Sequence, residues 1–96
     1  MVDIDAEELA SAKLMVEKKC KDASTQTIEA RVVDVSSEES MKELATEVFA
    51  EHGACHFLFN NAGVQLNVPE GGILADNATM TKTLDVNLYG PIHGCL

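Results

Sequence analysis

The feature that most constrains the fold is an apolar run that ends abruptly in polar and small residues, Phe57-Leu58-Phe59-Asn60-Asn61-Ala62-Gly63. A short apolar run bounded by turn-forming residues is typical of a strand that is buried on both faces of a sheet. In open α/β sheets, ligands bind just beyond the carboxyl ends of such strands. Taken alone, the polar end is equally compatible with an ordinary turn, because Asn and Gly are common turn residues.

The rest of the chain alternates between strand and helix patterns. Strands are expected at Met1–Val2, at 27–34 and at 55–60, the last being the apolar run. Apolar residues at helical spacing predict helices from the segment after Asp5 to about Lys21, over 36–53, and from 76 onward. Strands that alternate with helices indicate an α/β fold with a parallel sheet.

Residues that favour helix ends support these boundaries. Asp5 is a candidate N-cap for the first helix, and Ser36 with Glu39 forms a capping-box pattern at the start of the second. Gly53 is expected to end the second helix, and Asp76 or its neighbour Asn77 to cap the third.

Size and charge exclude several classes of protein. The 96 residues allow one small domain at most, and the net charge of −9 disfavours nucleic acid or an anionic membrane as a partner. An odd number of widely spaced cysteines, with neither a signal peptide nor a membrane span, predicts a cytoplasmic protein. His52 and His56 are separated by the helix-breaking Gly53, so we expect no metal site with Cys55.

Two more motifs join the Asn-Asn-Ala-Gly segment. Asp34-Val35 closes the strand at 27–34, and Val86-Asn87-Leu88-Tyr89-Gly90 lies in the last helix. In this order and spacing, the motifs resemble the short-chain dehydrogenase/reductase family over nearly the whole chain. The resemblance implies an oxidoreductase that interconverts alcohol and ketone groups of a small-molecule substrate. Its cofactor would be NAD, with NADP as the alternative. It also implies a homo-oligomeric parent protein.

Parts of the family pattern are missing. The glycine-rich turn after the first strand, the catalytic Ser and the Tyr-x-x-x-Lys pair do not occur, and Tyr89 is followed four residues on by His93 instead of Lys. We therefore expect residues 1–96 to be an internal fragment of a single NAD(P)-binding Rossmann domain in a chain of about 250 residues. The fold would be a partial doubly wound parallel sheet that lacks its first strand and its C-terminal half.

The resemblance implies roles for the residues at the strand ends. Asp3 matches the acid that binds the adenine ribose, and since no basic residue precedes Lys13, NAD is expected to be preferred over NADP. Asp3 and Asp5 could each serve as ligand or helix cap, and we expect Asp5 to be the cap. Asp34 and the Val35 amide would contact the adenine rim, although Asp34 could instead simply begin a turn.

Asn61, Ala62 and Gly63 would pass beneath the adenosine half of the cofactor, again by resemblance. The Asn60 side chain is expected to tie adjacent strands together. The loop 64–75 is expected to form one wall of the substrate pocket.

Asn87 is the candidate catalytic residue. Four residues later, Pro91 has no amide hydrogen and cannot donate to the Asn87 carbonyl, and Gly90 loosens the same turn. The matching Asn of the family completes a catalytic tetrad, and its carbonyl holds a water in a proton relay. A helix that simply ends near Gly90 is the alternative. Two other functions remain open: a non-catalytic nucleotide-binding module, and a flavodoxin-like signalling domain, which would not explain Asn87 together with Asn-Asn-Ala-Gly.

Overall fold

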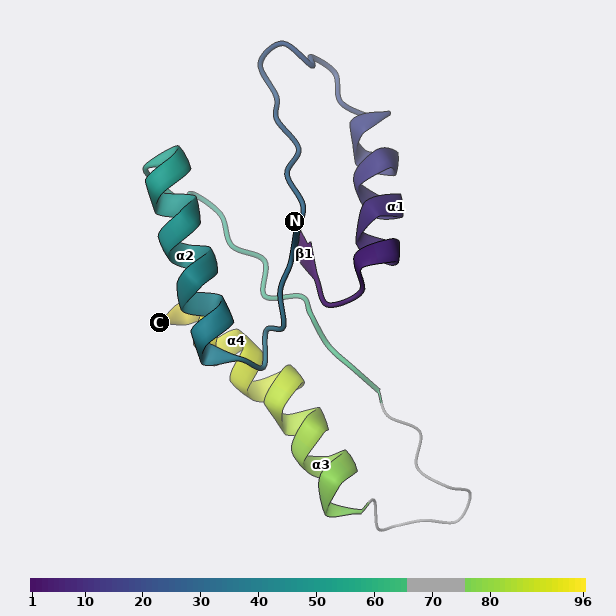
Figure 1. The fold of residues 1–96 in the computed structure, drawn as a ribbon, viewed down its shortest axis with the longest axis vertical. Helices are drawn as coiled ribbons and strands as arrows, with labels where there is room; N and C mark the ends of the chain where they lie inside the picture. Colours follow the sequence, from purple (N-terminus) through teal and green to yellow (C-terminus); the bar gives the residue numbers. More distant parts are fainter. Residues whose placement is uncertain (66–75) are drawn as a thin grey trace. The chain divides into compact units, whose positions relative to one another are not determined.

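The computed structural model describes residues 1–65 and 76–96 (Figure 1). These residues form two compact units, Met1–Asp34 and Val35–Leu96, each of which is described by itself. Most of the loop expected to form a substrate-pocket wall, residues 66–75, lies outside the described residues.

The first unit contains two short parallel strands and one helix. Strand β1 (Val2–Asp3) pairs with β2 (Arg31–Val32), and Val2 lies opposite Arg31. The pairing is extended by the terminal ammonium of Met1, which donates to the Glu29 carbonyl at 2.8 Å. The parallel sheet and its connecting helix confirm the α/β class. The strand predicted over 27–34 is shorter than expected, because β1 offers a partner only two residues long.

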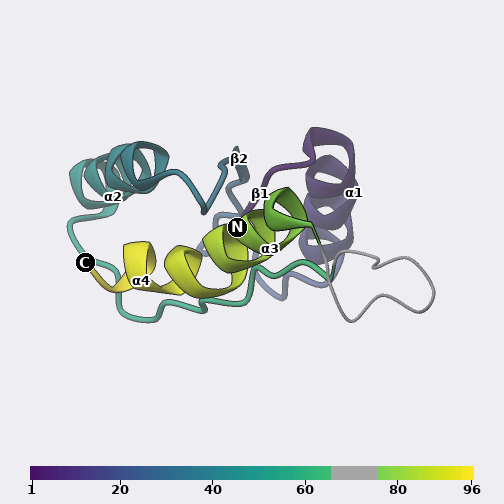
Figure 2. The same ribbon diagram turned by 90° about the horizontal axis from the view of Figure 1, so that it is seen from below.

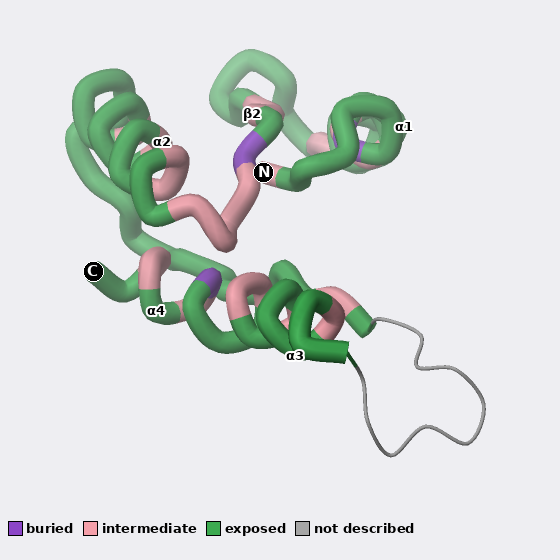
Figure 3. Tube along the Cα trace, turned by 60° about the horizontal axis from the view of Figure 1, so that its bottom comes forward, coloured by how far each residue is buried: buried purple, intermediate pink, exposed green. Residues whose placement is uncertain are grey.

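Helix α1 (Ala6–Glu17) follows β1 and is capped as predicted by Asp5, whose Oδ1 accepts from the amides of Glu7 and Glu8 at 2.9 and 3.0 Å. The expected end near Lys21 is wrong. The amides of Lys19 and Cys20 donate three residues back instead of four, so the α-helix tightens and stops at Glu17. Leu9 on α1 and Val33 after β2 are the buried apolar residues among those described (Figure 3).

The second unit begins with helix α2 (Glu38–His52). Its N-cap is Ser37, whose Oγ accepts from the Ser40 amide at 3.2 Å, so the predicted capping box on Ser36 is wrong by one residue. Ser40 stands where that motif needs Glu or Gln, so Ser37 caps the helix alone. Gly53 ends α2 as predicted, with the left-handed φ of 74° that glycine adopts without a Cβ penalty.

Three helical segments complete the second unit: α3 (Asn77–Leu84), the π-helical turn η1 (Asp85–Tyr89) and α4 (Gly90–Cys95). Figure 2 shows them as one continuous helical rod, drawn from green to yellow. Asp76 caps α3 by accepting from the Thr79 amide at 2.8 Å, as predicted, and this bond and the Thr79 hydroxyl lower the pKa of Asp76.

The predicted strand 55–60 is not a strand in the structure. A strand requires a hydrogen-bonded neighbour, and none of the described residues supplies one to this segment. Phe57 and Phe59 are accordingly 84% and 85% exposed. None of the described helices combines the length and apolar character needed to cross a membrane.

Candidate cofactor and catalytic site

The Asn87 side chain holds the backbone that follows the Asn-Asn-Ala-Gly segment. Its Oδ1 accepts from the Val64 amide at 2.7 Å, and its Nδ2 donates to the Val64 carbonyl at 2.8 Å. Both the oxygen and the nitrogen of the Asn87 carboxamide therefore hydrogen-bond to the backbone of Val64. Gly63 leaves room for this contact, since a Cβ there would lie 3.3 Å from Asn87 Oδ1.

Asn87 lies in the middle of the π-helical turn. The Gly90 amide donates to the Asp85 carbonyl, five residues back, which widens the helix by one residue at this point. In a regular α-helix the amide of residue 91 would serve the Asn87 carbonyl, and residue 91 is proline. The alternative in which the helix ends near Gly90 is wrong, because α4 continues to Cys95.

The start of α4 packs closely against Val35. Gly90 is buried, and a Cβ at this position would lie 2.9 Å from Val35 Cγ2, closer than real contacts allow. His93, one turn later, has its Nδ1 2.9 Å from the Val35 carbonyl oxygen. A carbonyl only accepts, so Nδ1 carries the proton and donates.

Asn60 contacts the same helix. Its Nδ2 lies 3.5 Å from Cys95 Sγ, and a Cβ on Gly94 would overlap its Oδ1. The prediction that Asn60 ties adjacent strands together is wrong in the described residues. The segment 55–60 has no strand beside it, so the carboxamide packs against α4 instead.

The helical rod formed by residues 77–95 therefore contacts two of the predicted ligand-binding segments. Asn87 holds the residue after Gly63, whereas Gly90 and His93 hold Val35. These contacts bring together Val35, Gly63 and Asn87, three of the predicted site residues, around one helix.

Gly90→Ala tests these contacts in the intact protein. The added methyl group must displace the Val35 side chain, whose branched Cβ has few alternative rotamers. We expect KM for the predicted NAD cofactor to rise about three- to ten-fold, the equivalent of about one hydrogen bond. Ala78→Val adds apolar volume at an exposed position of the same helical rod and is the control, for which we expect that KM to stay nearly unchanged. Equal KM values for wild type and Gly90→Ala in steady-state kinetics would contradict the prediction.

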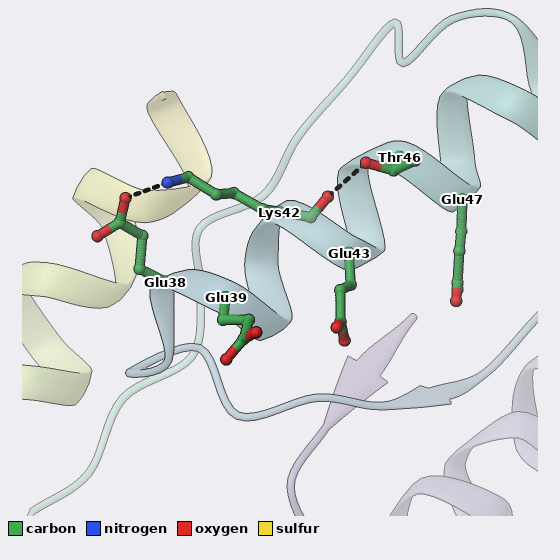
Figure 4. A pocket seen from close by; sticks show the side chains of 6 residues that line it. All are labelled: Glu38, Glu39, Lys42, Glu43, Thr46 and Glu47. Carbon is green, nitrogen blue, oxygen red and sulfur yellow. Dashed lines mark hydrogen bonds and ion pairs between the residues drawn. The ribbon is translucent and has the colours of Figure 1, made fainter.

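A shallow hollow along α2 does not belong to this site. All the residues that line it come from that one helix: Glu38, Glu39, Lys42, Glu43, Thr46 and Glu47 (Figure 4). Lys42 pairs with Glu38 and, by its hydrogen bond and its charge, lowers the pKa of that carboxyl. The remaining carboxylates would repel the phosphates of a nucleotide, so this is a solvated helix face.

Comparisons with known proteins identify the family of this chain. The family model for short chain dehydrogenase matches residues 2–96. The chain belongs to the short-chain dehydrogenase family. A solved structure of a protein from Novosphingobium aromaticivorans, assigned as a short-chain dehydrogenase, is 31% identical in sequence and superposes with a TM-score of 0.79. The match covers 97% of this chain and 32% of that one, so the chain spans about a third of its length.

Two further candidate residues of this short-chain dehydrogenase chain lie in the first unit. Asp3 and Asp34 stand at the carboxyl ends of the parallel strands β1 and β2, and such ends meet at one edge of a sheet. Asp3 Oδ1 accepts from the Asp5 amide at 2.9 Å. A carboxylate offers about four acceptor positions, so this turn leaves Asp3 able to accept from a sugar hydroxyl.

Sequence reasoning missed His93 and Gly94, and it missed what the Asn87 side chain does. Gly90 and Gly94 are four residues apart and so share one face of a helix, which could have indicated a close approach by another segment. Nothing in the sequence signals that His93 reaches Val35, because 58 residues separate the two.

Proposed function

We propose that this chain is part of an NAD-preferring oxidoreductase that interconverts alcohol and ketone groups of a small molecule. Membership of the short-chain dehydrogenase family supports the reaction class. The observation that carries the proposal is the double hydrogen bond from Asn87 to Val64, which links a π-helical turn to the end of the Asn-Asn-Ala-Gly segment.

The cofactor proposal assigns one role to each predicted residue. Asp3 accepts from the adenine ribose, Asp34 accepts from the adenine amino group, and the Val35 amide donates to a ring nitrogen. Asn61, Ala62 and Gly63 lie beneath the adenosine half. The residues fit a nucleotide, since Gly63 adds no side chain to the approach and Asp3 keeps free acceptor capacity. The bound nicotinamide would supply the hydride acceptor.

Asn87 takes part in the proton relay of the proposed reaction. Its side chain fixes the π-helical turn against Val64, and this holds its backbone carbonyl in place to bind a relay water. The Tyr that serves as acid and base, the Lys that lowers its pKa and the Ser that orients the substrate would come from outside residues 1–96.

The location and assembly follow the same proposal. We place the protein in the cytoplasm, which is supported by three free cysteines, Cys20, Cys55 and Cys95. A homo-oligomer is proposed by resemblance to the family alone.

The test of this function uses an intact protein that contains this chain. Purified enzyme is mixed with NAD or NADP and a panel of secondary alcohols, and the reduced nicotinamide is followed by its absorbance. We expect turnover with NAD at higher kcat/KM than with NADP. Binding of NAD without turnover of any alcohol, or of any ketone in the reverse direction, would favour a non-catalytic nucleotide-binding module.

Asp3→Ala tests the cofactor preference. Loss of the carboxylate removes an acceptor for the ribose hydroxyls and removes the repulsion that a 2′-phosphate would meet. A hydrogen bond to a charged group is worth about 1.5–3 kcal/mol. We expect the ratio of kcat/KM for NAD to that for NADP to fall at least ten-fold in steady-state kinetics. Asp5→Ala, which removes the helix cap, serves as the control, and an unchanged ratio in Asp3→Ala would exclude the ribose role.

A further inference from the structure

We propose that His93 is a positioning residue for the adenine of the cofactor, and that it acts through the backbone of Val35. The inference rests on the proposed function, in which the Val35 amide donates to the adenine ring. It deepens that function by naming what holds the amide in place.

The contact itself is direct. His93 Nδ1 donates to the Val35 carbonyl at 2.9 Å, and the Val35 side chain is packed against Gly90 from the same helix. Val35 is therefore held at two points, its carbonyl and its side chain. With both held, the Val35 Cα and the amide nitrogen bonded to it are held in position, and the steric limits on φ of a β-branched residue narrow the directions in which the amide can point.

The imidazole is itself held in place. The ring of Tyr89 stacks on it with centroids 6.4 Å apart and an interplanar angle of 30°. Glu38 of α2 lies near enough to feel the imidazole: Lys42 lowers the pKa of the Glu38 carboxyl most, and the charge of the His93 ring lowers it further by a smaller amount. Nδ1 carries a proton both in the Nδ1–H tautomer and in the imidazolium, so the bond to Val35 persists in either charge state.

This arrangement predicts an effect confined to one end of the cofactor. Without the His93 hydrogen bond, Val35 is held by its side chain alone, and the adenine loses a donor of fixed direction. The nicotinamide end does not depend on Val35. The affinity for the adenosine half should therefore fall while the affinity for the nicotinamide half does not change.

The experiment measures binding to the intact dehydrogenase by calorimetry, with ADP-ribose as the adenosine probe and nicotinamide mononucleotide as the adenine-free probe. His93→Leu is expected to weaken ADP-ribose about three- to ten-fold, the equivalent of one hydrogen bond, and to leave nicotinamide mononucleotide and kcat at saturating NAD unchanged. His93→Asn is expected to restore ADP-ribose affinity, because its Nδ2 takes the place of Nδ1. His52→Leu removes an exposed imidazole from the end of α2 and is the matched control.

Each outcome decides the proposal. Unchanged ADP-ribose affinity in His93→Leu would overturn it, as would an equal loss for nicotinamide mononucleotide, which would indicate general damage. If His93→Leu does not fold, His93→Gln replaces it: its amide is one methylene further out, so it should bind ADP-ribose less tightly than His93→Asn, and equal affinities would overturn the inference. A wild-type protein that binds neither ADP-ribose nor NAD would overturn the proposed function itself.

Discussion

Replacement of Asn87 by leucine in the intact protein is expected to lower kcat by about a hundred-fold or more, the usual size of a general acid/base contribution. Leucine has the same number of side-chain heavy atoms and the same branching at Cγ, but it can neither accept from the Val64 amide nor donate to the Val64 carbonyl. The π-helical turn then loses its attachment, and the Asn87 carbonyl loses the fixed position from which it would hold the relay water. We expect kcat to fall much more than cofactor affinity, because the role proposed for Asn87 is in proton transfer.

Asn77→Leu is the matched control for this prediction. It makes the same exchange in the same helical rod, at an exposed position on the first turn of α3, and we expect near-normal kcat. Steady-state kinetics of the two variants, measured as a function of pH, distinguish a role of Asn87 in the proton relay from a purely structural role. An Asn87→Leu enzyme with normal kcat would show that the residue is structural and that the relay does not depend on its side chain.

Residues 1–96 expressed alone are expected to show no cooperative unfolding, no tight NAD binding and no dehydrogenase activity. Among the described residues, Leu9 and Val33 are the only buried hydrophobic side chains, whereas Phe57, Leu58 and Phe59 are all more than half exposed. A chain that buries so little apolar surface cannot offset the conformational entropy lost on folding.

The segment 55–60 also lacks the hydrogen bonds of a sheet. In the doubly wound order 3-2-1-4-5-6 the first strand pairs with both the second and the fourth, and without it this segment has no neighbour. The exposed backbone of this segment can bond to water, but it contributes no strand hydrogen bonds to the total stability, which is about 5–15 kcal/mol for an ordinary domain. Differential scanning calorimetry and NAD titration provide the measurement. A sharp transition in a monomeric sample that binds NAD at micromolar concentration would contradict the prediction.

The local elements could be predicted because local chemistry decides them. Asp5 and Asp76 cap their helices through side chains that reach only two or three residues along the chain, and Gly53 ends α2 through its own backbone freedom. The Ser36 prediction failed by one residue because two adjacent serines offer the same acceptor, and local sequence does not separate them.

The strands could not be predicted to the same extent. A strand exists only with a partner, and the apolar run at 55–60 carries a strand pattern whether or not a partner is present. The same dependence on distant partners limits how much of the candidate site could be predicted. The family resemblance predicts site roles for Val35, Asn61, Ala62, Gly63 and Asn87. The contacts that join Val35 to His93 and Asn60 to Cys95 span 58 and 35 residues, however. Such contacts depend on the tertiary fold, which single residues do not reveal.

The π-helical turn makes the length of this helix as important as its residues. Successive residues of an α-helix are about 100° apart, so the extra residue in Asp85–Tyr89 sets the angular phase between the part of the rod that carries Asn87 and the part that carries His93. Deleting one residue from the turn would restore a regular helix and rotate one part by about 100° against the other. Asn87 and His93 could then no longer reach Val64 and Val35 together. An insertion or deletion here should therefore be far less tolerated than a substitution at an exposed position of the same turn.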